Sequence, residues 1–77
     1  LNLAYFALEK AGNIACALNA ANEISVEAFL KGKIKFLDIA EINGSSIEKV
    51  TFVARPNYED YVATDEQTRI IAKELVG

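Results

Sequence analysis

Histidine, methionine and tryptophan are missing from the 77-residue sequence, and cysteine and proline occur once each. The lack of histidine excludes the Glu-x-x-His sites of di-iron bundles and the usual base for a serine or cysteine nucleophile. Cys16 cannot form an internal disulfide, and among apolar neighbours a free thiol behaves as a small hydrophobe, as in proteins of a reducing compartment. Because even an initiator methionine is absent, we expect the chain to be a fragment of a longer protein.

Positive charge is also scarce, since the formal net charge is −3 and the pI is about 4.8. Nucleic acids and anionic membranes attract clustered Lys and Arg, so we expect neither as a partner. The longest apolar runs, such as Ile14 to Leu18, are far shorter than the roughly 20 residues that span a bilayer. A hydrophobic share of 52% in so short a chain predicts one globular domain over residues 1–77.

Apolar spacing predicts helices in the first half of the chain. The first helix is expected over Leu1 to Ala11 and ends at Gly12. One face of it carries Leu1, Ala4, Tyr5 and Leu8. Asn13 is a candidate N-cap for a second helix from Ile14 to Lys31.

The second predicted helix is apolar on nearly every side, which is typical of a helix surrounded by others. Its apolar positions form two adjacent faces, Ile14, Leu18, Ala21 and Ser25 on one and Ala17, Ala20, Ile24 and Ala28 on the next. We therefore expect it to be the centre of a small bundle.

The second half predicts a connection, a helix, a loop and further helical pieces. Lys33 to Leu37 is expected to be an ordered connection, and Asp38 is expected to cap or open a third helix through Val50, bent or split at Gly44. A loop is expected around Arg55-Pro56.

Two capping boxes then predict two pieces that meet at an angle. Asn57 with Asp60 begins a brief helix through Val62, and Thr64 with Gln67 begins a final helix from Asp65 to Leu75. The predicted fold class is all-α, a small bundle of roughly four helices.

Three polar residues, Asn19, Asn22 and Glu23, interrupt the most apolar helix. Their i, i+3 and i, i+4 spacing allows them to share one face. Buried amides and carboxylates need hydrogen-bond partners. We interpret the three as a structural polar network with loop backbone or with a neighbouring domain.

The sequence supports a metal-binding or catalytic site less well than it supports a structural polar network. Glu23 with Glu27 offers only two oxygens to a hard cation, and Glu27 with Lys31 is typical of a surface ion pair. Neither Cys16 nor the serines (Ser25, Ser45 and Ser46) has a general base beside it, and no glycine-rich loop follows a strand. We therefore predict no catalytic, cofactor-binding or metal-binding residue.

The run from Ala17 to Leu30, continued by Gly32, Ile34, Phe36, Asp38 and Ile39, closely resembles the C-terminal region of 1-deoxy-D-xylulose 5-phosphate reductoisomerases. The resemblance extends upstream to Leu3-Ala4-Tyr5 and downstream to Glu59-Asp60-Tyr61-Val62, Asp65 and Arg69. It covers most of the chain and is weakest over Asn43 to Asn57.

The resemblance implies a homodimeric enzyme of the non-mevalonate isoprenoid pathway. Such an enzyme converts 1-deoxy-D-xylulose 5-phosphate to 2-C-methyl-D-erythritol 4-phosphate with NADPH and Mg²⁺ or Mn²⁺. In that family an N-terminal Rossmann-type domain holds NADPH, a central domain supplies the metal ligands, and the C-terminal domain is a helical bundle. This chain would then contact the NADPH-binding and catalytic domains of its own polypeptide and be inactive alone. The implied location is the bacterial cytoplasm, or a plastid in a eukaryote.

The main alternative is a stand-alone helical interaction module that binds a partner helix in an apolar groove. A small independent enzyme is the third reading, but it would need an acid, base or metal constellation that the sequence does not supply.

Overall fold

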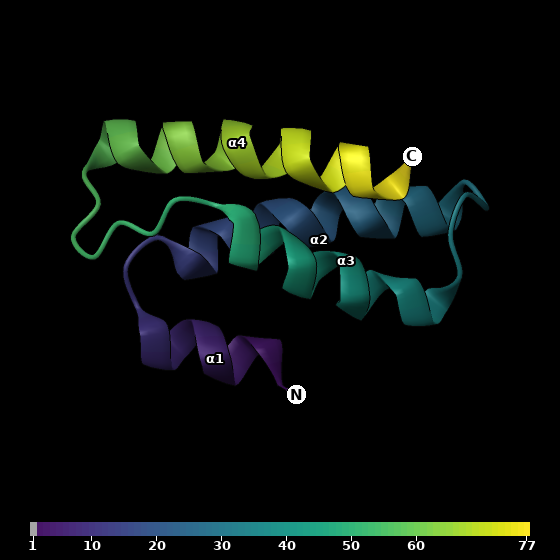
Figure 1. Ribbon diagram of the computed structural model, residues 1–77, viewed down its shortest axis with the longest axis horizontal. Coiled ribbons are helices and arrows are strands. Elements are labelled where there is room, and N and C mark those ends of the chain that lie inside the picture. The colour runs from purple at the N-terminus through teal and green to yellow at the C-terminus, as the bar shows by residue number, and fades with distance from the viewer. Residues whose placement is uncertain (1) are drawn as a thin grey trace.

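The computed structural model describes residues 2–77 and places them in four helices without a strand (Figure 1). The helices are α1 (Leu3–Lys10), α2 (Ile14–Leu30), α3 (Phe36–Lys49) and α4 (Tyr58–Val76). The predicted all-α bundle is confirmed. Of the predicted first-helix face, Leu1 lies outside the described residues. None of the four helices is long and apolar enough to cross a membrane.

Helix α2 is the centre of the bundle, as its composition predicts. It packs against α1, α3 and α4, and its buried residues are small except for Ile14. Ala17, Ala20 and Ala21 have no exposed surface at all. Because alanine side chains are short, the backbones of the neighbouring helices approach α2 closely. Two apolar clusters result, one around Ile14 with Ile47 and Val50, the other around Ala21 with Ile42 and Ala72.

Helix α1 packs on the bundle through Leu3 and Ala7, and not through the predicted apolar face that carries Tyr5 and Leu8. Ala7 is buried and Leu3 packs against the same cluster, whereas Tyr5 and Leu8 are 67% and 77% exposed. The reason is that α1 packs mainly on α2, and a narrow stripe of Leu3 and Ala7 is enough for that contact. The line of Ala4, Tyr5 and Leu8 lies outside the core.

Helix α3 begins two residues before Asp38 and runs without a break. Asp38 accepts a hydrogen bond from the Lys35 backbone N–H at 2.8 Å, so it helps to cap the helix from the third helical position, whereas the N-cap itself is Lys35. The predicted connection from Lys33 to Leu37 is therefore wrong at its end, because Phe36 and Leu37 are the first residues of α3. The predicted bend or split at Gly44 is wrong, because the helix continues to Lys49. A helical glycine costs about 1 kcal/mol relative to alanine. Asn43 and Ser46, which lie before and after Gly44 in α3, are both buried in the bundle, so this part of the helix is packed against its neighbours.

Helix α4 is one continuous helix, so the prediction of two pieces is wrong. The first capping box is confirmed, with the Asp60 N–H donating to Asn57 Oδ1 at 2.8 Å. Thr64 does not start a second helix, because its side chain is buried and bonded to Asn13. Thr68 Oγ1 instead donates to the Thr64 carbonyl at 2.6 Å, one turn back along the same helix.

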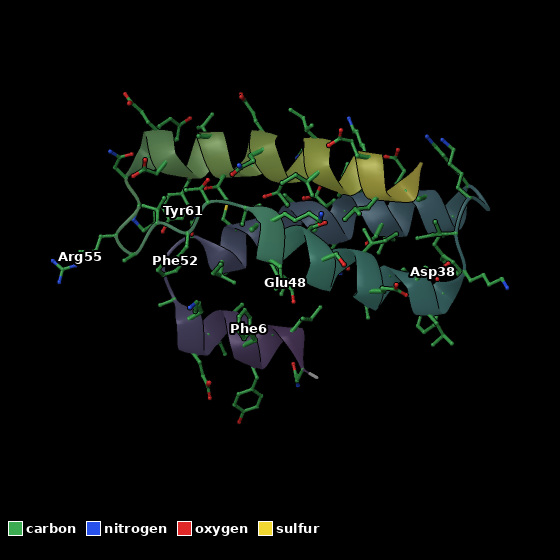
Figure 2. All side chains as sticks on the ribbon, in the orientation of Figure 1. Phe6, Asp38, Glu48, Phe52, Arg55 and Tyr61 are labelled. Atoms are coloured by element: carbon green, nitrogen blue, oxygen red, sulfur yellow. The ribbon has the colours of Figure 1, made fainter. Side chains whose placement is uncertain are left out.

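The predicted loop before α4 spans residues 50–57 and packs against the turn between α1 and α2. Phe52 lies beside that turn, whereas Arg55 points away from the bundle (Figure 2). Gly12 in the turn has φ +58°, and a Cβ there would lie 2.4 Å from the Val53 carbonyl oxygen. Glycine is therefore required both by the backbone conformation and by the close approach of the loop.

Candidate functional site

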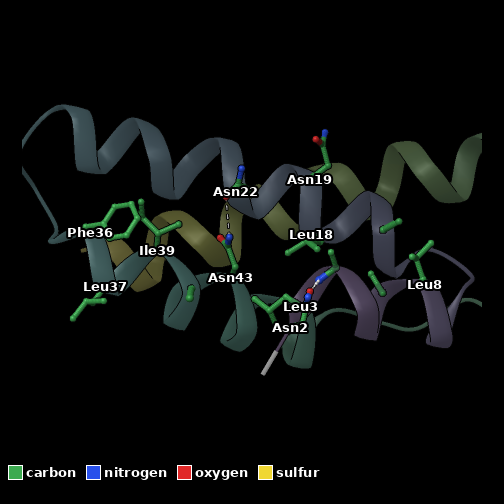
Figure 3. Close-up of a pocket in the computed structure, with 14 residues that line it drawn as sticks. Asn2, Leu3, Leu8, Leu18, Asn19, Asn22, Phe36, Leu37, Ile39 and Asn43 are labelled. Atoms are coloured by element: carbon green, nitrogen blue, oxygen red, sulfur yellow. Dashed lines mark hydrogen bonds between the residues drawn. The ribbon is translucent and has the colours of Figure 1, made fainter.

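An open groove of about 1120 Å³ lies between α1, α2 and α3 (Figure 3), and we call it the α1–α3 groove. All of its lining side chains are uncharged: Asn2, Leu3, Ala4, Ala7, Leu8, Ala15, Leu18, Asn19, Asn22, Phe36, Leu37, Ile39, Ala40 and Asn43. The lining is mostly aliphatic or aromatic, with four asparagine amides. Such a surface can bind apolar chain but offers no charge for catalysis or for an ionic ligand.

The rim of the groove is strongly exposed. Leu8 is 77% exposed, Phe36 is 69% exposed and Leu37 is 83% exposed. The Phe36 ring packs against the Phe29 ring in an edge-to-face arrangement, at a centroid distance of 5.7 Å. Large apolar side chains that gather around one hollow mark an interaction surface.

A chain of amide and hydroxyl hydrogen bonds joins α2 and α3 beneath the groove. Asn43 Nδ2 donates to Asn22 Oδ1 at 3.0 Å (Figure 3), and Ser25 Oγ donates to Asn43 Oδ1 at 2.8 Å. Asn43 is only 5% exposed and Ser25 is fully buried. Asn22 itself is exposed, so its amide nitrogen is available to a group outside the described chain.

Asn19 and Glu23 belong to a different cluster, which faces α4. Asn19 Nδ2 donates to Glu23 Oε2 at 3.2 Å, and Arg69 Nη2 donates to the same oxygen at 3.2 Å. Arg69 Nε also donates to Asp65 Oδ2 at 2.9 Å. The predicted polar set is therefore divided: Asn22 bonds to α3, whereas Asn19 and Glu23 bond within α2 and to α4. All three are exposed in residues 2–77, so the expected burial is not found there.

The buried polar centre of the bundle is Asn13, which the sequence predicts only as a cap. Its side chain makes no capping bond and has no exposed surface. Asn13 Nδ2 donates to the Thr51 carbonyl and to Thr64 Oγ1, both at 2.8 Å, and Oδ1 accepts from the Val53 N–H at 2.9 Å. One amide thus joins the start of α2, the loop 50–57 and α4.

Cys16 is a weak nucleophile in this setting. Its Sγ lies 3.6 Å from the Tyr61 carbonyl oxygen, with which it makes a hydrogen bond. Burial raises the pKa of the Cys16 thiol, nearby Asp65 raises it further, and Arg69 acts in the opposite direction. The thiol is therefore protonated at neutral pH, and the thiolate is the reactive form.

The acidic residues do not form a set that fits a metal ion. Within residues 2–77 no group of three His, Cys, Asp or Glu side chains is close enough to hold one. Glu27 pairs with Lys31 at 3.2 Å, which confirms the predicted surface ion pair, and Glu23 is engaged by Arg69. Glu23 and Glu27 thus have cationic partners from the chain itself.

The comparisons with known proteins agree with one another. The sequence model of the family described as the DXP reductoisomerase C-terminal domain matches residues 1–71. The chain is 49% identical over 77 residues to the 1-deoxy-D-xylulose 5-phosphate reductoisomerase of Phocaeicola vulgatus, covering 100% of the chain and 20% of that protein. The enzyme of the same name from Bacteroides thetaiotaomicron is 49% identical over 76 residues, with 99% and 20% covered.

A relative from Colwellia psychrerythraea with the same name is 50% identical over 69 residues, which are 88% of the chain and 17% of the relative. The chain thus spans about a fifth of the length of the curated relatives that it matches.

Proposed function

The chain belongs to the DXP reductoisomerase C-terminal domain family, and from this premise we propose that it is the C-terminal helical domain of a 1-deoxy-D-xylulose 5-phosphate reductoisomerase. The parent enzyme would rearrange 1-deoxy-D-xylulose 5-phosphate and reduce the product with NADPH to 2-C-methyl-D-erythritol 4-phosphate. This is a step of isoprenoid biosynthesis by the non-mevalonate pathway. The single observation that carries the proposal is the match of the family over residues 1–71.

We assign residues 2–77 a structural role in that enzyme. Their acidic groups do not fit Mg²⁺ or Mn²⁺, and the α1–α3 groove has an uncharged lining that does not suit the phosphates of NADPH. The nicotinamide cofactor and the metal would then be held by the NADPH-binding and catalytic domains of the same polypeptide. We further propose a homodimer in the bacterial cytoplasm, a setting supported by relatives that come from bacteria.

The activity is tested on the full-length protein that contains this chain. Purified enzyme is mixed with 1-deoxy-D-xylulose 5-phosphate, NADPH and Mg²⁺, and the loss of NADPH absorbance is followed. Oxidation that requires both the sugar phosphate and the metal is expected. If NADPH is not consumed under any of these conditions, the assignment to a reductoisomerase is wrong.

The structural role is tested by Asn22→Leu in the same protein, with Asn19→Leu as the matched control on the same helix. Asn22→Leu leaves the buried Asn43 amide without its acceptor, whereas Asn19 bonds only to the exposed Glu23. An unpaired buried amide costs about 1–3 kcal/mol. We expect Asn22→Leu to lower the melting temperature clearly and to leave kcat per folded molecule nearly unchanged. A normal melting temperature with a large loss of kcat would contradict the structural role.

The second candidate, a stand-alone helical interaction module, is favoured by one observation, the exposed rim of the α1–α3 groove. The two candidates differ in the size of the native polypeptide. An antibody against these residues should detect a protein several-fold heavier than 8.4 kDa in an extract if the domain belongs to the enzyme. A band at 8.4 kDa alone would favour the module.

A further inference from the structure

We propose that the α1–α3 groove is filled, in cis, by the segment of polypeptide that directly precedes residue 1 in the full-length protein. This inference rests on the proposed function, because it takes the chain as the C-terminal part of a longer one. The segment would bind between α1, α2 and α3, where α1 leaves much of the groove uncovered.

Helix α1 is too short to cover the flank of the bundle. At 1.5 Å per residue its 8 residues extend about 12 Å, whereas the 17 residues of α2 extend about 25 Å. Figure 1 shows α1 running from the N-terminus, below the middle of the bundle, toward the turn before α2. The first turn of α3 lies toward the other end of the bundle, so α1 does not cover it. Phe36 and Leu37, the most exposed rim residues of α3, belong to that turn.

The backbone enters α1 from the groove itself. Asn2 lines the groove, has an extended conformation (φ −93°, ψ 103°) and caps α1 by accepting from the N–H groups of Ala4 and Tyr5. Because Asn2 itself lines the groove, the polypeptide that precedes residue 1 begins beside the groove. About four extended residues at roughly 3.3 Å each would cover the part that α1 leaves open.

The lining also fits this occupant chemically. A groove without charged side chains binds an apolar, uncharged segment, and the exposed Asn22 adds a side-chain amide that can bond to the backbone of such a segment. A segment joined covalently to residue 1 is present at an effective concentration in the millimolar range, whereas a second copy of the chain would lose translational freedom on binding. Tethering therefore favours the segment in cis.

The same contact would stabilise α1. An isolated helix shorter than about 12–15 residues is marginal in water, and α1 has 8 residues that pack mainly on α2. A segment lying against Leu3, Ile39 and Ala40 would extend that packing onto α3.

The test is photo-crosslinking in the full-length protein. The photoreactive residue p-benzoyl-L-phenylalanine replaces Leu37, which is 83% exposed, so the substitution does not disturb the core. The matched control replaces Ile70, which is 61% exposed and lies on α4, the helix farthest from α1 in Figure 1. Cross-linked peptides are identified by mass spectrometry, and mixing isotope-labelled with unlabelled protein distinguishes links within one chain from links between chains.

We expect position 37 to link to the peptide that ends at α1, within the same chain, at a several-fold higher yield than position 70. Links to another subunit, links confined to residues 2–77, or no link above the control would each overturn the inference. NADPH oxidation measured on the same samples separates the two proposals. An active enzyme without the cis link refutes only the occupant, whereas an inactive one with the link refutes only the reaction.

Discussion

Replacing Asn13 by alanine is the most informative single change in this domain. The substitution removes both polar atoms of a side chain that has no exposed surface. Three hydrogen bonds of 2.8, 2.8 and 2.9 Å are lost with it. The start of α2, the loop 50–57 and α4 would no longer be joined through one side chain, although the Asn13 backbone N–H would still donate to the Val53 carbonyl and the Thr51 N–H to Gln67 Oε1.

The expected loss of stability follows from those three bonds. A hydrogen bond contributes about 1 kcal/mol net, and a buried group left without a partner costs a further ~1–3 kcal/mol. The Thr51 carbonyl belongs to an exposed residue and can bind water, whereas the Thr64 hydroxyl is buried and cannot. Three bonds at about 1 kcal/mol each and one unpaired buried group at about 1–3 kcal/mol add up, so we expect Asn13→Ala to lower the free energy of unfolding by about 4–6 kcal/mol. That is a large part of the total, since domains have about 0.05–0.15 kcal/mol per residue.

The assay is urea unfolding followed by far-UV circular dichroism. The matched control is Asn57→Ala, which also removes an asparagine that accepts a backbone N–H, but an exposed one. Loss of such a cap costs about 1 kcal/mol. Thr64→Val serves as a milder variant, because it removes one of the three bonds and should cost about 1 kcal/mol in a protein that still unfolds cooperatively.

The result that would refute the reasoning is equal destabilisation by Asn13→Ala and Asn57→Ala. It would mean that the buried amide contributes no more than an exposed cap. A value for Thr64→Val near zero would lead to the same conclusion even if Asn13→Ala failed to fold.

Three other predictions concern separate parts of the bundle. Gly12→Ala should destabilise by several kcal/mol, and Gly32→Ala by only about 1 kcal/mol, because both glycines have positive φ but only Gly12 has neighbours where a Cβ would lie; urea unfolding of the pair checks this. Alkylation of Cys16 by iodoacetamide should be slower in the folded chain than in urea and should accelerate with pH. Equal alkylation rates in the folded and the unfolded chain would contradict the raised pKa of Cys16. Because the thiol loses its proton more easily in the unfolded chain, the free energy of unfolding should fall as pH rises past the ordinary thiol pKa. Arg69→Met should cost at most about 1 kcal/mol, and less at high salt, because Arg69 pairs with exposed carboxylates; a salt-independent loss in urea unfolding would contradict this.

Local signals in the sequence predict most of the helix boundaries. The cap at Asn57 with Asp60, the glycine stops at Gly12 and Gly32, and the carboxylate of Asp38 all act within four residues of their partners. Such interactions depend only on neighbouring residues, so their spacing is visible in the sequence.

The errors arise where distant contacts decide the outcome. Thr64 with Gln67 has the spacing of a helix start, yet Thr64 is bonded to an amide 51 residues earlier in the chain and α4 runs through it. Gly44 has the composition of a break, yet the neighbouring side chains of Asn43 and Ser46 are buried. Tertiary packing outweighs propensities of about 1 kcal/mol at both positions.

The groove was not visible in the sequence for the same reason. Its lining comes from three helices, and spacing along the chain does not show which apolar residues form the rim. Leu8 belongs to the predicted apolar face of the first helix and Leu37 to the predicted connection, yet they are 77% and 83% exposed at the groove. Asn19, Asn22 and Glu23 stand out in the sequence as polar residues of an apolar helix, but the division of their bonds between α3 and α4 depends on the bundle geometry.

The alanines of α2 have a consequence for how the sequence of this domain can vary. Ala17, Ala20 and Ala21 are fully enclosed, and each meets its neighbours with a single methyl group. A larger side chain would force helices apart, serine would bury a hydroxyl, and glycine would weaken the helix. In a library that samples every amino acid at every position, these three small residues should therefore tolerate fewer replacements than the large apolar residues on the groove rim.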